Sequence, residues 1–115
     1  MTYLDFATLI KGIEISEGET IPAAYFQFEK ETAKEPPFIC YYYAGSDDVM
    51  ADNSNYARIR PVIVELYTDN KDFALEKIVE DYFISHELPF NKMEAYIESE
   101  KMYQITYNME VVING

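Results

Sequence analysis

The spacing of hydrophobic residues predicts a helix at the start of the chain. Large apolar side chains recur at the i, i+3, i+4 and i+7 positions of one helical face: Phe6, Leu9, Ile10 and Ile13. Thr2 can cap this helix, and Asp5 lies three residues later, where a carboxylate favours the first turn. Gly12 predicts that the helix ends near Lys11.

A second helix is predicted after residue 69. Its apolar stripe has helical spacing: Leu75, Ile78, Val79, Tyr82 and Phe83. We expect Asp69 to cap this helix, Asp72 to support its first turn, and Pro89 to close the segment. The other carboxylates of the helix are interpreted as a solvated face: Glu76, Glu80 and Asp81.

The remaining apolar segments predict strands. Residues 24–29, 38–44 and 59–68 precede the second helix, and residues 91–98 and 101–113 predict a final hairpin. The order α-β-β-β-α-β-β describes a single α+β domain over the whole chain, 1–115, with two helices packed on a mainly antiparallel sheet. The connecting segments 14–22 and 45–56 are expected to be loops.

Three features of these strands bear on a partner subunit. Residues 38–44 form a continuous apolar run, which fits either a strand covered on both faces or one with a partner on its second face. Pro61 places the start of its strand at an edge or a bulge. Residues 101–113 would span roughly 43 Å when extended, against a radius of gyration of about 13 Å for a compact domain of this size. The last strand must therefore bend, or overhang and pair with another subunit.

Charge narrows the classes of function. The chain has 21 acidic and 9 basic residues, with a formal net charge of -12. Phosphate backbones and anionic membranes are bound through Lys and Arg, so neither sequence-specific nucleic-acid binding nor a membrane partner is expected. Cys40 is the single cysteine, so neither an intrachain disulfide nor a cysteine-based zinc site can form.

A search for catalytic chemistry nominates no site. His86 is interpreted as a helix-terminal residue, and Cys40 as a small buried hydrophobe. The acidic segment with Asp47, Asp48 and Asp52 lacks the alternating ligands, central glycine and closing glutamate of a calcium loop. We therefore expect a protein that is not an enzyme, with no catalytic, cofactor-binding or metal site and no cofactor.

Tyrosine is the unusual residue of this sequence, with 11 copies. Tyrosine is favoured at interfaces because it buries a large ring and keeps a polar tip. The pattern fits either core packing alone or core packing together with a subunit interface. The candidates for subunit contact are strand residues: Tyr41, Tyr43, Tyr67, Tyr103 and Tyr107.

Three strings of residues resemble one family. Residues 38–53 begin with Phe-Ile-Cys-Tyr-Tyr-Tyr-Ala-Gly-Ser-Asp-Asp, residues 64–72 contain Glu-Leu-Tyr-Thr-Asp, and residues 94–103 contain Tyr-Ile-Glu-Ser-Glu-Lys. From Pro37 onward the chain is similar in character to the small tail-completion or tail-terminator proteins (head–tail joining proteins) of long-tailed phages and prophages of Gram-positive bacteria. Before that, the resemblance is one of layout only, and residues 14–21 fit a local insertion.

The resemblance implies a structural assembly protein of the virion. Such proteins form a homo-oligomeric ring, commonly a hexamer, at the head-proximal end of the tail, where they end growth of the tail tube and join tail to head. The implied partners are further copies of the chain, the tail-tube protein and the head–tail connector protein. Assembly would take place in the cytoplasm of the host bacterium, and DNA would only pass through the ring.

The long loop of the family corresponds in position to residues 45–56. The resemblance therefore implies an assembly-interface or lumen role for one set of residues: Asp47, Asp48, Val49, Met50, Asp52, Asn53 and Tyr56. Aspartates in such a lumen would repel phosphate and let DNA slide. A different class stays open, an acidic protein-binding module such as a DNA mimic that inhibits a nucleic-acid-binding enzyme.

Overall fold

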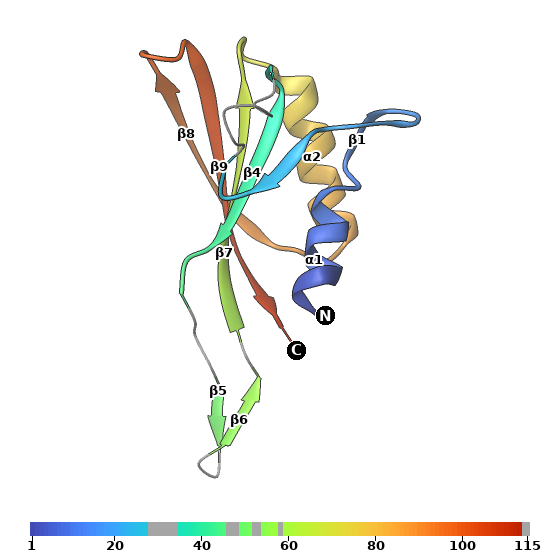
Figure 1. Cartoon of the computed structure of the whole chain (residues 1–115), viewed down its shortest axis with the longest axis vertical. Coiled ribbons are helices and arrows are strands. Elements are labelled where there is room, and N and C mark those ends of the chain that lie inside the picture. The colour runs from blue at the N-terminus through green and yellow to red at the C-terminus, as the bar shows by residue number, and fades with distance from the viewer. Residues whose placement is uncertain (28–34, 46–48, 52–53, 58, 114–115) are drawn as a thin grey trace.

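The computed structural model describes residues 1–27, 35–45, 49–51, 54–57 and 59–113. Within these residues two helices and nine strands follow one another (Figure 1). The helices are α1 (Tyr3–Ile10) and α2 (Phe73–Ser85). The strands are β1 (Glu14–Ser16), β2 (Glu19–Thr20), β3 (Ala23–Tyr25), β4 (Phe38–Tyr43), β5 (Val49–Ala51), β6 (Ser54–Ala57), β7 (Ile59–Thr68), β8 (Phe90–Ile97) and β9 (Met102–Val112).

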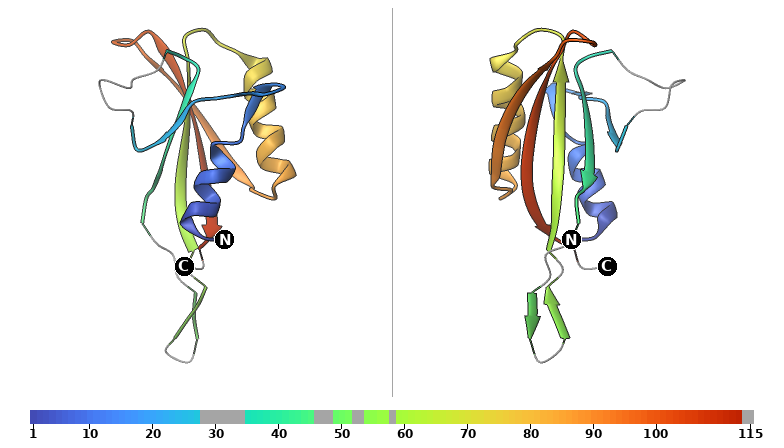
Figure 2. Two further views of the ribbon diagram at one scale, coloured as in Figure 1. Left: turned by 45° about the vertical axis from the view of Figure 1, so that its right-hand side comes forward. Right: turned by 90° about the vertical axis from the view of Figure 1, so that its left-hand side faces the viewer.

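A five-stranded sheet forms the centre of the molecule in the described part of the chain. Its strand order is β3-β4-β7-β9-β8, and every neighbouring pair is antiparallel except β3 with β4. Both helices lie on one face of this sheet, and the other face carries no helix (Figures 1 and 2). The expected α+β class, with two helices on a mainly antiparallel sheet, is confirmed.

The core lies between the sheet and the two helices. Alternate residues of β4, β7 and β9 point to the helices and are almost fully buried: Ile39, Tyr41, Val62, Val64, Leu66, Ile105, Tyr107, Met109 and Val111. The helices contribute Phe6, Ile10, Leu75, Val79 and Phe83. The inward side chains of the strands, two residues apart, thus pack against the apolar stripes of the helices in one core, as the hydrophobic pattern predicted.

The first helix begins and ends as predicted. Thr2 and Asp5 form a capping box, in which each side chain accepts a hydrogen bond from the backbone N–H of the other. The helix stops before Gly12, which lies against α2. A Cβ at Gly12 would stand 3.1 Å from the hydroxyl of Tyr82, and that hydroxyl donates a 2.6 Å hydrogen bond to the carbonyl of Leu9. Glycine therefore lets the end of α1 pack closely on α2.

The start of the second helix differs from the prediction. Asp72, not Asp69, is the N-cap, and its Oδ1 accepts a 3.0 Å hydrogen bond from the N–H of Leu75. Residues 69–72 form the bend that follows β7, so Asp69 lies outside the helix. Both aspartates have the chemistry of a cap, and the length of the bend decides between them.

Both segments expected to be loops contain short hairpins. Strands β1 and β2 pair within 14–22, with Gly18 in the turn at a φ of 80°. Strands β5 and β6 pair from within 45–56 to one residue beyond it, with Val49 opposite Ala57. Sequences rich in turn residues conceal strands this short, because two or three residues carry no visible alternation. We call the β5–β6 hairpin the arm; it projects from the end of the sheet (Figure 1).

The strand at 24–29 is shorter than predicted. β3 ends at Tyr25, because Phe26 adopts a φ of 68°, which breaks extended pairing. Its continuation through residues 28–29 lies outside the described residues.

The last strand neither bends away nor overhangs its main neighbour. β9 pairs with β7 in continuous register, from Thr68 opposite Tyr103 to Ile59 opposite Val112. Its pairing with β8 ends at Phe90 opposite Met109, so residues 110–112 extend beyond that strand only. The molecule accommodates the length by being elongated, 50 × 31 × 27 Å with a radius of gyration of 15.1 Å.

Pro61 lies in a central strand, at the point where one neighbour has ended. Tyr43, the last residue of β4, pairs with Val62, and the next residue, Ala44, donates a 2.9 Å hydrogen bond to the carbonyl of Pro61. An N–H at position 61 could have donated to this terminal pair of β4 and β7. Because β4 ends here, the missing donor removes one hydrogen bond at most and leaves the rest of the ladder intact. Pro61 therefore lies beside the end of a neighbouring strand, and not on an edge strand of the sheet as expected.

Candidate functional site

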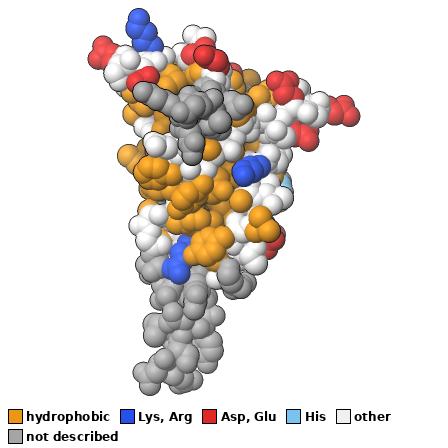
Figure 3. All heavy atoms as spheres, viewed as in Figure 1, with side chains coloured by type: hydrophobic (Ala, Val, Ile, Leu, Met, Phe, Trp, Pro, Cys, Tyr) orange, Lys and Arg blue, Asp and Glu red, His pale blue; other side chains and the backbone are white. Residues whose placement is uncertain are grey.

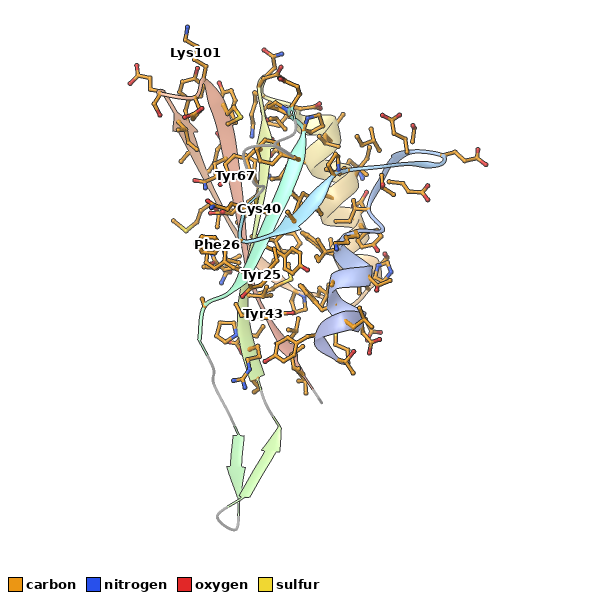
Figure 4. The ribbon with its side chains drawn as sticks, in the orientation of Figure 1. Tyr25, Phe26, Cys40, Tyr43, Tyr67 and Lys101 are labelled. Atoms are coloured by element: carbon orange, nitrogen blue, oxygen red, sulfur yellow. The ribbon has the colours of Figure 1, made fainter. Side chains whose placement is uncertain are left out.

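Aromatic side chains gather at the β3–β4 edge of the sheet. We call this group the aromatic edge: Tyr3, Tyr25, Phe26, Tyr41, Tyr42 and Tyr43. Tyr25 packs edge-on against Tyr41 at 5.4 Å between ring centroids and lies 5.8 Å from Tyr43. Tyr3, from α1, meets Tyr43 at 4.9 Å, and Phe26 meets Tyr42 at 5.8 Å. Tyr25 and Tyr43 lie side by side on one face of the sheet edge, whereas Phe26 packs with Tyr42 on the other face (Figure 4).

The aromatic edge surrounds a hollow of about 580 Å³, lined by Tyr3, Tyr25, Tyr41, Tyr43, Gly45 and Arg60. Arg60 Nε donates a 2.9 Å hydrogen bond to the hydroxyl of Tyr3, which fixes the guanidinium at the rim. Burial, reinforced by neighbouring tyrosines, raises the pKa of Tyr43 to about 12. At neutral pH Tyr43 is therefore a neutral phenol, and the Arg60 guanidinium brings a positive charge to the rim of the hollow.

Much of this apolar surface is open to solvent. Phe26 is 61% exposed and Tyr25 52%. Hydrophobic side chains occupy the middle of this view of the molecule, with the acidic ones around its upper and right-hand rim (Figure 3). The described residues 23–27, 38–45 and 59–61 contain no carboxylate side chain. A contiguous apolar patch of this kind usually marks a binding surface.

A cluster of charged side chains lies between α2 and strand β8, at the end of the sheet opposite the aromatic edge. We call it the ionic cluster: Lys71, Glu76, Glu80, Lys92 and Glu94. Glu76, on α2, is 2% exposed, with Lys71 Nζ 2.6 Å from one carboxylate oxygen and Lys92 Nζ 2.8 Å from the other. Lys92 also lies 2.8 Å from Glu80, and Lys71 pairs with Glu94. These contacts tie α2 to strand β8.

The lysines set the ionisation of the cluster. Burial by itself would raise the pKa of Glu76, but the hydrogen bonds and charges of Lys71 and Lys92 outweigh it and lower that pKa below the ordinary value. Tyr107 is fully buried and donates a 2.8 Å hydrogen bond to Glu80. Burial and that carboxylate raise the pKa of Tyr107. The cluster is thus charged, internally paired and anchored in the core.

Glu76 corrects the prediction of a solvated face on the second helix. Its carboxylate faces the core side of α2, and Glu80 is partly buried. Asp81 is exposed and makes the expected i, i+4 pair with Lys77 at 2.6 Å. The cations that satisfy Glu76 come from residues 71 and 92, which sequence spacing along the helix does not reveal.

Beside the ionic cluster, β8 is the last strand of the sheet. Within the described residues no strand pairs with its outer side. Its residues 91–96 are all exposed, among them Met93 at 64% and Tyr96 at 50%. We call this the β8 edge. An eight-residue strand in unbroken register with a bare outer side is a template for pairing with another chain.

The tyrosines proposed for subunit contact divide into two groups. Tyr41 is 4% exposed and Tyr107 fully buried, so both belong to the core of the single chain. Tyr43, Tyr67 and Tyr103 are partly exposed. The Tyr67 hydroxyl is held by Glu65 and Gln104 on the helix-free face, and Tyr103 packs against Tyr96 at 5.0 Å.

The exposed residues Leu4, Tyr25, Phe26, Met93 and Tyr96 were not selected from the sequence. Of these, only Leu4 could have been predicted to be exposed, because it lies outside the apolar stripe of its helix.

Three of the residues proposed for the loop lie in the arm. Val49 and Met50 belong to β5 and Tyr56 to β6. Asp47, Asp48, Asp52 and Asn53 lie outside the described residues. The structure therefore places the segment at one end of the elongated molecule, as a hairpin rather than a loop (Figure 1).

The residues weighed for chemistry occupy structural positions. His86 is the exposed C-cap of α2, with Nδ1 2.8 Å from the carbonyl of Tyr82. Cys40 is 5% exposed within β4, as expected for a small buried hydrophobe. In the described part of the chain, no three potential ligands come together as a metal site, and neither helix is long and apolar enough to cross a membrane.

Comparison with known proteins finds a similar fold in a chain of a virus-like particle. No protein-family model and no curated protein matches the sequence. Among solved structures, a chain of the "Virion of native gene transfer agent (GTA) particle" has a similar fold, with a TM-score of 0.51. The match covers 95% of this chain and 84% of that chain, at 14% sequence identity. At that identity the likeness is one of fold, and the fold is thus one that occurs in a virion component.

Proposed function

We propose that this protein is a structural component of a phage-like particle and not an enzyme. The observation that carries the proposal is the likeness of fold to a chain of a gene transfer agent virion, which extends over 95% of this chain. Two surfaces built for contact rather than chemistry, the aromatic edge and the β8 edge, support it. The protein would reside in the virion after assembly in the bacterial cytoplasm.

More specifically, we propose a tail-completion or tail-terminator protein at the head–tail interface. The chain would form a ring, of six copies by analogy with the family it resembles, at the head-proximal end of the tail. Its partners would be further copies of itself, the tail-tube protein and the head–tail connector protein. A single domain with two open sheet edges and a projecting arm is suited to contacts on several sides.

The arm would make the contacts along the axis of the particle. It extends from the end of the sheet where β7 begins, so it can reach beyond the ring formed by the domain. If the residues Asp47, Asp48 and Asp52 face the passage, their charge would keep DNA from adhering during ejection. No sequence-specific contact with DNA and no contact with a membrane are part of this role.

The test is assembly by the purified chain, alone and with purified tail-tube protein. Light scattering after size-exclusion chromatography and negative-stain microscopy should show rings, and added chain should stop growth of tail tubes at a defined length. Chain that never forms rings and leaves tube length unchanged contradicts the proposal. A stable monomer that binds a purified basic DNA-binding enzyme and inhibits it would support the acidic-module alternative instead.

The role of the arm has a separate test. Replacing residues 47–53 by a short Gly-Ser turn should leave the domain folded, because the buried residues of the described chain all lie outside this segment. In a complementation assay we expect loss of tails joined to heads. Full joining by the shortened chain would remove the arm from the proposed mechanism.

A further inference from the structure

We infer that the aromatic edge of one copy of this chain binds the β8 edge of the next copy. The inference rests on the proposed function in one respect only, namely that the protein assembles with itself. It specifies which surfaces meet, and it can fail while ring formation stands.

The topology of the sheet favours this head-to-tail contact. The order β3-β4-β7-β9-β8 puts the aromatic edge and the β8 edge at opposite ends of the same sheet. A ring of identical subunits needs two different surfaces that fit each other, one on each side of every subunit. Two unlike open edges at opposite ends of one sheet meet that requirement, whereas a contact of one edge with itself would stop at a dimer.

Both edges leave backbone groups to be satisfied. β8 is bare along its outer side in the described chain. β4 extends past its short neighbour, because their pairing ends at Tyr25 opposite Tyr41. Beyond that point the N–H of Tyr43 donates to the hydroxyl of Tyr25, a long contact of 3.5 Å and the one partner found among the described residues. A strand from another copy can replace such weak partners with ladder hydrogen bonds.

Charge favours the same pairing. Each subunit carries a net charge of -12, so two copies repel unless the contact avoids unpaired carboxylates. The aromatic edge contributes Arg60 and, among its described residues, no carboxylate. Beside the β8 edge, Lys71 and Lys92 already neutralise most of the charge of Glu76, Glu80 and Glu94. Among the described residues, both surfaces therefore present little unpaired negative charge to a second acidic copy.

The side chains at the two edges are complementary in kind. Met93 and Tyr96 protrude from β8, at 64% and 50% exposure. The hollow opposite is walled by four tyrosines, and thioether–aromatic and aromatic–aromatic contacts are both favourable. Phe26, which packs against Tyr42 at the same sheet edge, is 61% exposed. Contact would remove from water the large apolar side chains that the fold leaves exposed on both edges.

Two edge variants and one control test this contact. The first variant, Tyr25→Glu with Phe26→Glu, blocks the aromatic edge, and the second, Met93→Glu with Ala95→Glu, blocks the β8 edge. The control, Ile84→Glu with Lys77→Gln, changes exposed residues of α2 away from both edges. Each pair of substitutions makes the net charge more negative by two, from -12 to -14. All six residues are exposed, so the variants should fold, which circular dichroism and thermal melting would verify.

Sedimentation velocity of each variant, and of the two edge variants mixed, gives the decisive result. We expect the control to assemble like the unmodified chain and each edge variant to remain a monomer of about 13.4 kDa. The equimolar mixture should form a dimer, because the intact β8 edge of the first variant fits the intact aromatic edge of the second. Rings from either edge variant, dimers of the first variant by itself, or a mixture that stays monomeric would each overturn the inference.

The outcomes separate the inference from the proposed function. If the unmodified chain and both edge variants form rings equally well, the assigned surfaces are wrong while ring formation stands. If the unmodified chain stays monomeric even with the tail-tube protein, the proposed function fails and the inference fails with it.

Discussion

The two sides of the sheet satisfy their side chains in different ways. At the ionic cluster, Glu76 is buried with two lysines, and its charge is balanced within the same chain. At the aromatic edge, Phe26 and Tyr25 remain largely exposed although burial of such side chains is worth roughly 1.5–3 kcal/mol each. The charges of the ionic cluster are balanced within the single chain, whereas the apolar side chains of the aromatic edge stay in contact with solvent. The two groups therefore differ in how much of their free energy the single chain already gains.

The largest effect should come from leaving Glu76 without its cations. We expect Lys71→Met together with Lys92→Met to destabilise the fold by about 3 kcal/mol, since an uncompensated buried carboxylate is costly. Urea unfolding followed by circular dichroism measures the change. The matched control is Lys77→Met, which breaks an exposed ion pair and should leave the midpoint unchanged. Equal midpoints for the two variants would show that Glu76 does not need its partners.

A smaller loss is expected from Tyr107→Phe, which removes one hydroxyl from the core. That hydroxyl donates to Glu80 from a fully buried ring, so its removal should cost about 1–2 kcal/mol. Tyr96→Phe removes an exposed hydroxyl of the neighbouring strand and serves as the control. If both variants unfold at the same urea concentration, the link between core and ionic cluster carries no stability.

Acid should weaken the ionic cluster before it affects the aromatic edge. Because Lys71 and Lys92 lower the pKa of Glu76 in the folded state, the unfolded state binds the proton more readily. The contribution is fully present above the ordinary glutamate pKa of 4.5 and is lost as pH falls through the lower folded value. Unfolding free energy measured across this range should fall less steeply with acid in Glu76→Gln than in the unmodified chain. Parallel curves would contradict the assignment.

The smallest effect on the single chain should come from the aromatic edge itself. Phe26→Ser replaces a ring that is 61% exposed, so we expect a change in monomer stability of less than about 0.5 kcal/mol. The same substitution should weaken self-association clearly. Thermal melting of dilute protein and sedimentation at high concentration measure the two quantities. A large drop in melting temperature without loss of association would reverse the comparison between the two sides.

Local chemistry made the regular elements predictable from sequence. The capping box of Thr2 and Asp5, the alternation along residues 101–113 and the bounds of residues 59–68 each depend on neighbours in the chain. The sequence also indicated Cys40 and His86 as structural residues, and their surroundings agree. These features follow from periodicity and caps, which a single sequence displays directly.

The surroundings of several side chains could not be predicted, because they depend on residues far away in the sequence. Glu76 was interpreted as a solvated carboxylate because its partner Lys92 lies on a strand after the helix. Tyr41 and Tyr107 were proposed for subunit contact because aromatic alternation does not say which face a helix will cover. The exposed group around Tyr25 arises only when α1, β3 and β4 come together. In each case pairing across the sheet, not local pattern, decides the environment.

The junction between the arm and the sheet has a mechanical consequence. The arm continues into β4 on one side and β7 on the other, and β7 is paired with β9 along all ten of its residues. A pull on the arm along the strands would therefore load those hydrogen bonds in shear, all together, instead of peeling them apart one by one. Such a connection can bear tension at the tip of the hairpin while the domain stays folded.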